Sequence, residues 1–281
     1  MISSENTEEW QKIINKNPPF NIIIGDLMES KIKVLEDVKL KNPVFVEGLP
    51  GIGNVGRIAA GYLISELKMK KFAEMYSPHF LPLVILQGDA VAHMLKCEFY
   101  YYKGKKNDII VFTGDTQSIS PEGHYEICEK VLDFAKKLGV NEIITLGGFA
   151  QGEEIKDPTV IGAVNDKKLL KKYEKFEIDF GKKHSVGTIV GASGLLLGLG
   201  KERKIDALCL MGESIGLPLV TDPKAADKVL QVLIKILGIN LSLGRLEKTI
   251  TEMDEKIQKT DKIHKDILKD IPKKEDVKYI G

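Results

Sequence analysis

One short segment has the spacing of a dinucleotide-binding turn, because Gly51, Gly53 and Gly56 follow a predicted strand and open a predicted helix. Glycine at such a turn lets the backbone approach a pyrophosphate at the helix N-terminus. Leu49 and Pro50, however, lengthen the turn beyond its usual form. Two interpretations stay open. The segment is either the site of a nucleotide-using enzyme such as a ligase or hydrolase, or a set of glycines that serve tight turning and helix–sheet packing.

Carboxylates stand at the ends of three predicted strands, at Glu47, Asp115 and Glu213. In open α/β sheets ligands bind beyond the carboxyl ends of strands, where two or three acids could gather for acid–base or metal chemistry. Isolated acids at strand ends also cap the helix that follows. The five histidines show no metal-ligand spacing, and none lies beside these acids in sequence. We expect no catalytic residue and no metal site.

The other nucleophilic side chains give weaker signals. Ser193 lies in the sequence GASG, which lacks the GxSxG spacing of a nucleophile elbow. Cys97, Cys128 and Cys209 are far apart and form no CxxC, which disfavours both a disulfide framework and a zinc site. Cys209 lies in an apolar run and is predicted to be buried in a protein of a reducing compartment. No cofactor is expected.

The strands and helices that must position these residues follow a repeated pattern. Short apolar runs that end at glycine predict buried central strands at 44–46, 109–112, 143–146 and 208–211. A helix is expected at 55–67, and two more follow Ser-Pro or Asp-Pro starts and end at glycine, at 120–139 and 222–238. This alternation predicts an α/β fold with a central, mostly parallel sheet. Strand-like segments within 72–103 predict that the sheet is mixed.

Two further segments are predicted to be helical. Residues 187–200 are apolar almost all round, so we expect a helix buried against the sheet, with its glycines allowing close packing. From 246 onward the steps between seam positions alternate between four and three residues, which is a heptad pattern. The seam consists of Leu246, Ile250, Met253, Ile257, Thr260, His264, Ile267 and Ile271.

The heptad segment divides the chain into three expected parts. They are an α/β core over 1–244, a helix or coiled coil over 245–271, and a flexible tail over 272–281. At 1.5 Å per residue this helix would be roughly 40 Å long. It is expected either to pack on its own domain or to zip to another subunit, and both arrangements stay open.

Charge and hydropathy exclude several classes of protein. Among 281 residues, Lys and Arg number 41 and Asp and Glu number 40, and this balance argues against nucleic-acid or membrane-surface partners. The chain starts with polar and acidic residues rather than a signal peptide. No apolar run reaches the roughly 18 to 20 residues that span a bilayer. We expect a cytoplasmic protein.

Several stretches of the chain, in order, resemble the PAC2 family. They are GLPGIGNVGRIAAGYL at 48–63, SPHFLP at 77–82, TLGGF at 145–149, GASGLLLGLG at 191–200, LMGES at 210–214 and DPKAADKVLQVLIKILG at 222–238. The set is most similar to the archaeal branch, whose members are homologues of the eukaryotic proteasome-assembling chaperones. The resemblance implies a three-layer αβα core similar to nucleoside phosphorylases but without their active site.

The resemblance also implies a function and partners. Archaeal members form homo-oligomers, such as a tetramer or pentamer, and a paralogous PAC2 chain is an alternative partner. They bind the α subunits of the 20S proteasome, either as assembly chaperones or as ATP-independent activators. In the family a C-terminal motif of a hydrophobic residue, tyrosine and any residue enters a pocket between α subunits. There its terminal carboxylate pairs with a lysine.

This chain departs from that motif at its end. It finishes Lys278-Tyr279-Ile280-Gly281, so the tyrosine stands one place too early. A shifted motif would still make Tyr279, Ile280 and Gly281 the partner-binding residues, because a charged tail with two hydrophobic side chains suits docking in a groove. The alternatives are binding through a partner chain with the better motif, or a frayed terminus without a role.

Overall fold

The computed structural model describes residues 29–86, 90–153, 155–181, 187–216 and 221–246. Its main sheet has eight strands, and a separate pair of strands forms a hairpin. The sheet strands are β1 (Lys31–Val34), β2 (Val44–Glu47), β3 (Lys70–Tyr76), β6 (Cys97–Tyr102), β7 (Ile109–Gly114), β8 (Glu142–Ala150), β9 (Val160–Val164) and β10 (Asp206–Ser214). The hairpin consists of β4 (Val84–Leu86) and β5 (Ala92–Met94).

The sheet is parallel at its centre and antiparallel at both sides. Its strand order is β1-β3-β6-β7-β2-β8-β10-β9, in which β7, β2, β8 and β10 run parallel. These four are the glycine-ended apolar runs of the sequence, and every residue of β2 is buried. The mixed sheet is therefore confirmed, with the segment around 72–103 supplying the antiparallel strands β3 and β6.

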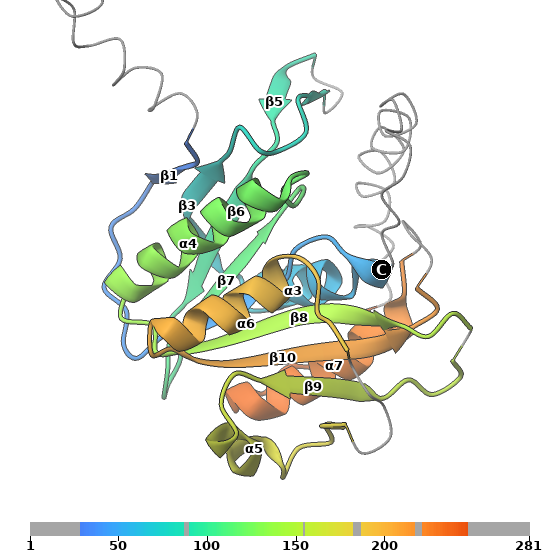
Figure 1. Cartoon of the computed structure of the whole chain (residues 1–281). Coiled ribbons are helices and arrows are strands. Elements are labelled where there is room, and N and C mark those ends of the chain that lie inside the picture. The colour runs from blue at the N-terminus through green and yellow to red at the C-terminus, as the bar shows by residue number, and fades with distance from the viewer. Residues whose placement is uncertain (1–28, 87–89, 154, 182–186, 217–220, 247–281) are drawn as a thin grey trace, which may run out of the picture.

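Helices cover both faces of the sheet and make the three-layer core (Figure 1). On one face lie α4 (Pro121–Lys137) and α6 (Ala192–Glu202), and on the other lie α3 (Val55–Glu66) and α7 (Pro223–Leu237). Two short helices complete the set, η1 (Ile52–Asn54) and α5 (Lys168–Tyr173). Each face carries its own apolar cluster, with Phe45 and Phe99 in the first and Ile58 and Leu230 in the second.

The predicted helix ends are confirmed for α4 and α7. The Ser120 hydroxyl accepts a hydrogen bond from the Gly123 amide at 3.1 Å, and the Asp222 carboxylate accepts one from the Ala225 amide at 3.0 Å. Each cap is followed by proline in the first turn, where a missing amide hydrogen costs nothing. Gly238 ends α7 in the left-handed conformation, with φ of 63°.

The helix expected over 187–200 begins later than the sequence pattern indicates. In the structure α6 starts at Ala192, after Gly191 with φ of 82°, and continues to Glu202. The start is set by a distant residue, because the Gln117 side chain accepts a hydrogen bond from the Ala192 amide at 3.0 Å. The helix is also less enclosed than expected, since Gly198 is exposed and nothing lies within 4 Å of a Cβ placed there.

The described part of the chain ends with Leu246 packed against the core. Leu246 is buried in the cluster that α3 and α7 share. The expected helix over 245–271 and the tail over 272–281 lie almost wholly outside the described residues. Within the ranges that the structure describes, no helix is both long and apolar enough to cross a membrane.

Candidate functional site

The glycine-rich turn is the first candidate site, and its glycines make close contacts with the protein itself. A Cβ added at Gly56 would lie 2.3 Å from the Leu146 carbonyl oxygen, and one added at Gly48 would lie 2.3 Å from the Gly56 carbonyl oxygen. Real Cβ atoms do not approach so closely, so α3 can rest on β2 and β8 because these positions lack side chains. Helix–sheet packing therefore accounts for Gly56.

The other two glycines of the turn differ from each other. Gly53 has φ of 61°, and a Cβ there would lie 2.8 Å from the Ser214 hydroxyl oxygen. Its carbonyl oxygen also accepts a hydrogen bond from the Asp222 amide at 2.9 Å. Gly51, by contrast, has an extended backbone, and the nearest atom to its added Cβ is the Gln117 amide nitrogen at 3.9 Å. Conformation and packing explain Gly53, while Gly51 is under neither constraint.

Gln117 joins the glycine-rich turn to the start of α6. Its side-chain amide donates to the Pro50 carbonyl oxygen at 2.6 Å and accepts from the Ala192 amide at 3.0 Å. One side chain thereby satisfies two backbone groups from segments far apart in sequence. Sequence analysis could not predict this role, because a single glutamine in a loop has no characteristic pattern.

Glu47 is a fully buried carboxylate at the end of β2. One of its oxygens accepts from the Leu49 amide at 3.0 Å, and the other accepts from the Ser193 hydroxyl at 2.9 Å. Burial raises the pKa of Glu47 to about 7, and hydrogen bonds from Ser193 and from the Leu49 and Leu146 backbone offset part of this effect. Ser193, which lacks a nucleophile's spacing, thus ties α6 to the strand end.

The other two strand-end acids bond different neighbours. Asp115 accepts from the Lys96 amide at 3.1 Å and lies 3.9 Å from the Arg57 guanidinium, and burial raises its pKa despite these contacts. Glu213 accepts from the Gln151 side chain at 2.7 Å and from both the amide and the hydroxyl of Thr159 at 2.8 Å. These hydrogen bonds fasten loops to strand ends, as a structural role requires.

The three acids do not form one cluster of ligands. Glu47 bonds Leu49 and Ser193, Asp115 bonds the Lys96 amide, and Glu213 bonds Gln151 and Thr159. Across the described ranges, no group of three or more His, Cys, Asp or Glu side chains is placed to hold a metal ion. The arrangement supports anchoring of loops more directly than acid–base chemistry.

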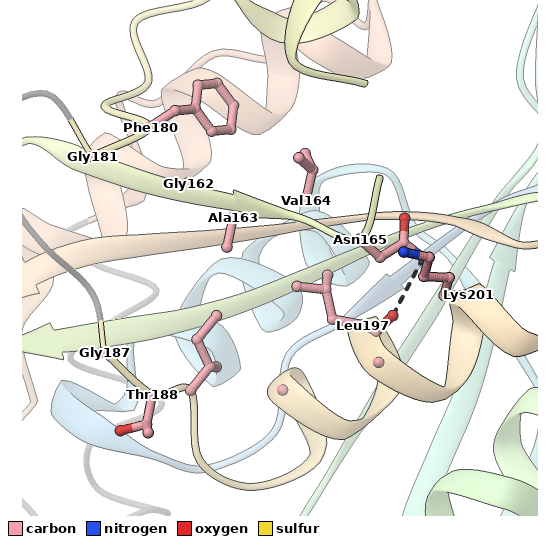
Figure 2. A pocket seen from close by; sticks show the side chains of 13 residues that line it. Gly162, Ala163, Val164, Asn165, Phe180, Gly181, Gly187, Thr188, Leu197 and Lys201 are labelled. Carbon is pink, nitrogen blue, oxygen red and sulfur yellow. Dashed lines mark hydrogen bonds between the residues drawn. The ribbon is translucent and has the colours of Figure 1, made fainter. Parts of the chain in front are cut away.

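A groove of about 510 Å³ lies elsewhere, between β9 and α6 (Figure 2). Its walls include Ala163, Phe180 and Leu197 together with glycines from both elements. The Asn165 amide, which faces the groove, already donates to the carbonyl oxygens of Leu197 and Ile205. Lys201 is the one charged side chain among its described lining residues. Most of the lining residues are therefore glycines and apolar side chains.

The predicted partner-binding residues Tyr279, Ile280 and Gly281 lie outside the described residues. The contacts of these three residues therefore stay a prediction. Comparison with known proteins supplies the remaining observation. A model of the PAC2 family matches residues 45–261, which is most of the chain.

The chain belongs to the PAC2 family.

Relatives agree with this membership over nearly their whole length. The uncharacterized protein MJ1210 of Methanocaldococcus jannaschii is 37% identical over 259 residues, which are 91% of this chain and 98% of the relative. The crystal structure of Pyrococcus furiosus PbaB, described as an archaeal proteasome activator, is similar with 41% identity and a TM-score of 0.75. The match covers 83% of this chain and 98% of PbaB.

A second solved structure from the same organism is also similar. Pyrococcus furiosus PbaA, described as an archaeal homolog of proteasome-assembly chaperone, shares 28% identity with a TM-score of 0.69. The match covers 85% of this chain and 99% of PbaA. The core of this PAC2 protein is therefore similar to two structures whose descriptions both refer to the proteasome.

Proposed function

We propose that this PAC2 protein is a non-enzymatic binding protein that engages the α subunits of the 20S proteasome, as an assembly chaperone or as an ATP-independent activator. One observation carries the proposal. The chain is 41% identical to an archaeal proteasome activator and matches 98% of that chain. The lower identity of 28% to the assembly-chaperone homolog favours activation over assembly.

The core geometry supports a binding role over catalysis. The acids at the strand ends, Glu47, Asp115 and Glu213, are engaged in hydrogen bonds to loops and to α6. Two of the three glycines in the turn, Gly53 and Gly56, allow the turn and α3 to pack closely on their neighbours. We therefore expect the residues that recognise a partner to lie on the surface and in the C-terminal segment.

The proposed contact is the C-terminal tail, with Tyr279 and Ile280 as the hydrophobic side chains and Gly281 as the terminal carboxylate. Leu246 is anchored in the core, and 35 residues follow it to the chain end. A helix over 245–271 would carry the tail roughly 40 Å beyond that anchor. A short segment that orders on binding gives modest affinity, which several copies in one oligomer would multiply.

The protein forms a homo-oligomer, or an assembly with a paralogous PAC2 chain, and acts in the cytoplasm without nucleic-acid or membrane partners. The near-neutral formal charge of +1 supports the last point, because nucleic-acid binding proteins present an excess of positive charge.

The tail assignment is tested by a pull-down of purified archaeal 20S proteasome with matched variants. The full-length protein is compared with a variant lacking residues 278–281 and with a Tyr279→Ala/Ile280→Ala double variant. A Lys273→Ala/Lys274→Ala variant is the control, since it changes the same tail upstream of the motif. We expect the control to bind and the other two variants to fail. Equal binding by all four proteins would move the contact to the core or the heptad segment.

The nucleotide interpretation of the glycine-rich turn has its own test. A ligand that binds only the folded protein raises the melting temperature, by an amount set by its concentration relative to Kd. We expect no shift in melting temperature with ATP, GTP, NAD or AMP in the presence of magnesium. A shift that is lost in a Gly51→Val variant would contradict the proposal, because Gly51 has room for a side chain.

A further inference from the structure

A second hollow lies at the edge of the sheet where the parallel strands begin. It has a volume of about 390 Å³ and is lined by Val44, Ile109 and Glu142, which are the first residues of β2, β7 and β8. The end of α7 and the residues at and just after the end of α5 form its other walls. The glycine-rich turn and the strand-end acids lie at the opposite ends of these strands, so this hollow is separate from the first candidate site.

Three exposed lysines from two parts of the chain line this hollow. Lys106 comes from the loop between β6 and β7, Lys172 from α5, and Lys175 from the segment that follows α5. Glu142 is the one acid among the described lining residues, and it accepts from the Lys172 ammonium at 2.6 Å and from the Tyr173 hydroxyl at 2.7 Å. Neither Lys106 nor Lys175 forms an ion pair within the described ranges. The hollow therefore presents two positive charges that no described carboxylate neutralises.

The ends of the nearby helices do not account for these two charges. Cations at a helix C-terminus are stabilised by the helix dipole, and Lys172 lies in the last turn of α5. The end of α7 has a lysine of its own, Lys235, which pairs with Glu177 at 2.9 Å. Lys106 stands in a loop between strands, and Lys175 lies beyond the end of α5. Helix-end electrostatics thus explains Lys172 and Lys235 and leaves Lys106 and Lys175 available to a ligand.

The floor of the hollow is apolar. Val44 and Ile109 are buried in the core, while Phe176, Ile236 and Leu237 are partly buried beside them. An apolar group that rests on these side chains removes their remaining surface from water, which favours binding. The ligand that fits both features carries an apolar group for the floor and negative charges for Lys106 and Lys175.

We propose that this hollow binds an acidic segment of a partner protein, with one apolar side chain on the floor and carboxylates beside Lys106 and Lys175. The aromatic side chains of the hollow do not suit nucleic acid, which stacks its bases on exposed aromatic faces. Tyr173 is buried, and the Lys175 ammonium lies over the Phe176 ring, 5.3 Å from its centroid. Arginine, whose planar fork matches phosphate, is absent from the described lining residues, and lysine acts as a point charge.

This inference goes beyond the proposed function and does not rest on it. The proposed contact with the proteasome uses the C-terminal tail, whereas the hollow lies in the core. The variant that lacks residues 278–281 is therefore expected to bind an acidic peptide as the full-length protein does. Its loss of proteasome with retention of the peptide separates the two contacts.

The test is fluorescence anisotropy of a short labelled peptide, made of glutamates around one phenylalanine, with the full-length protein. Lys106→Glu/Lys175→Glu reverses the two charges, and Lys33→Glu/Lys156→Glu is the control, with the same change of net charge at exposed lysines elsewhere. We expect the wild type and the control to bind, and the hollow variant to weaken binding by about tenfold or more. Binding should also weaken as salt rises from about 50 to about 300 mM.

Circular dichroism checks that both double variants are folded. Absence of binding by the wild type would overturn the inference. So would an equal loss of affinity in the two folded double variants, because the peptide would then respond to net charge and not to this hollow.

The class of ligand is tested with two further probes. A peptide of glutamates alone, equal in length, and a labelled oligouridylate are both expected to bind more weakly than the first peptide. An equal affinity for the glutamate peptide would overturn the inference, because the floor would take no part. Tighter binding of the oligouridylate would overturn it in favour of a nucleic-acid partner.

The chain itself contains one segment of the required chemistry, ENTEEW at residues 5–10, outside the described structure. A variant that lacks residues 1–28 separates this occupant from a partner protein. We expect this variant and the full-length protein to bind the peptide with similar affinity. Binding by the shortened variant alone would overturn the assignment to a partner, since the chain's own segment would then fill the hollow.

Discussion

At the scale of single residues, Glu47 is a buried carboxylate whose oxygens accept hydrogen bonds from the Leu49 amide and the Ser193 hydroxyl. Burial raises its pKa from 4.5 to about 7, and the hydrogen bonds from Ser193 and Leu49 offset only part of the cost of the charge. The protonated form is therefore favoured in the folded protein well above the pH at which it is lost from an unfolded chain.

This shift predicts a pH dependence of stability with a definite sign. Between pH 4.5 and 7 the folded state holds a proton on Glu47 that the unfolded state has lost. The free energy of unfolding therefore falls by about 3 kcal/mol as the pH rises from 4.5 to 7, and this contribution levels off above pH 7. Glu47→Gln, which cannot ionise, is expected to flatten the curve of stability against pH.

Urea denaturation from about pH 4.5 to about pH 8 measures this effect. Glu153→Gln, at an exposed loop position, is the control and should follow the wild-type curve. A Glu47→Gln variant whose stability changes with pH as steeply as that of the wild type would contradict the account. The buried environment of Glu47 would then not govern its ionisation.

Gly56 gives a second prediction at this scale. A methyl group there would press on the Leu146 carbonyl oxygen, so Gly56→Ala is expected to destabilise the protein by about 3 kcal/mol. Gly198→Ala is the matched control, because nothing lies within 4 Å of its added Cβ. Because Gly198 lies within a helix, Gly198→Ala should stabilise the protein by about 0.5 to 1 kcal/mol. Equal stability of the two variants in urea would show that packing does not explain the glycine.

The roles of some of these residues can be predicted from the sequence, and the roles of others cannot. The sequence left Gly51, Gly53 and Gly56 open between nucleotide binding and packing, and the close contacts at Gly53 and Gly56 now favour packing. It placed Glu47 at a strand end. It could not identify Ser193 as the partner of Glu47, because the two are 146 positions apart and only the fold brings them together.

At the scale of elements, the helix ends were predictable where local chemistry sets them and unpredictable where a distant residue does. Ser120 and Asp222 cap their own helices through bonds three residues away, so the sequence pattern suffices. The start of α6 instead depends on Gln117, which lies 75 positions from Ala192. The apolar and glycine-rich run before Ala192 contains no local signal that would have placed the boundary.

Because Gln117 bridges two backbone groups, we expect its substitutions to lower the free energy of unfolding by different amounts. Gln117→Ala leaves both the Pro50 carbonyl and the Ala192 amide without this partner, and should cost about 2 kcal/mol. Gln117→Glu keeps an acceptor for the Ala192 amide but loses the donor to Pro50, so its loss should be smaller. Urea denaturation measures both. A glutamate variant less stable than the alanine variant would contradict the bridge as described.

The β4–β5 hairpin has an exposed apolar face that a local sequence pattern does not predict. The sequence indicated strand-like segments within 72–103, and the structure confirms strands there. An apolar run predicts a strand covered on both faces, but it does not say whether the folded chain leaves one of these faces exposed. That distinction required the exposed fractions of Val84, Leu86 and Met94 in the folded protein.

At the scale of the whole molecule, the fold class followed from the alternation of strands and helices, and the strand order did not. The parallel centre was predictable because β2, β7, β8 and β10 are short apolar runs that end near glycine. Their order depends on which crossover packs on which face, and several orders satisfy the same pattern. The C-terminal helix and tail remain predictions, since residues 247–281 lie outside the described structure.

Membership of the PAC2 family indicates which partner this protein should be tested against. The strand-end acids Glu47, Asp115 and Glu213 make internal hydrogen bonds, and Gly53 and Gly56 make close internal contacts, so we propose that recognition uses the surface and the C-terminal segment. Similarity to PbaB, described as an archaeal proteasome activator, makes the proteasome the first partner to test.

The most direct measurement is sedimentation velocity of the full-length protein mixed with purified archaeal 20S proteasome. The PAC2 protein carries a fluorescent label, so that its sedimentation is followed separately from that of the proteasome. We predict that the labelled protein sediments with the proteasome, and that an excess of unlabelled PAC2 protein displaces it. Labelled protein that sediments at its own rate at every concentration tested would contradict the central claim that this PAC2 protein binds the proteasome.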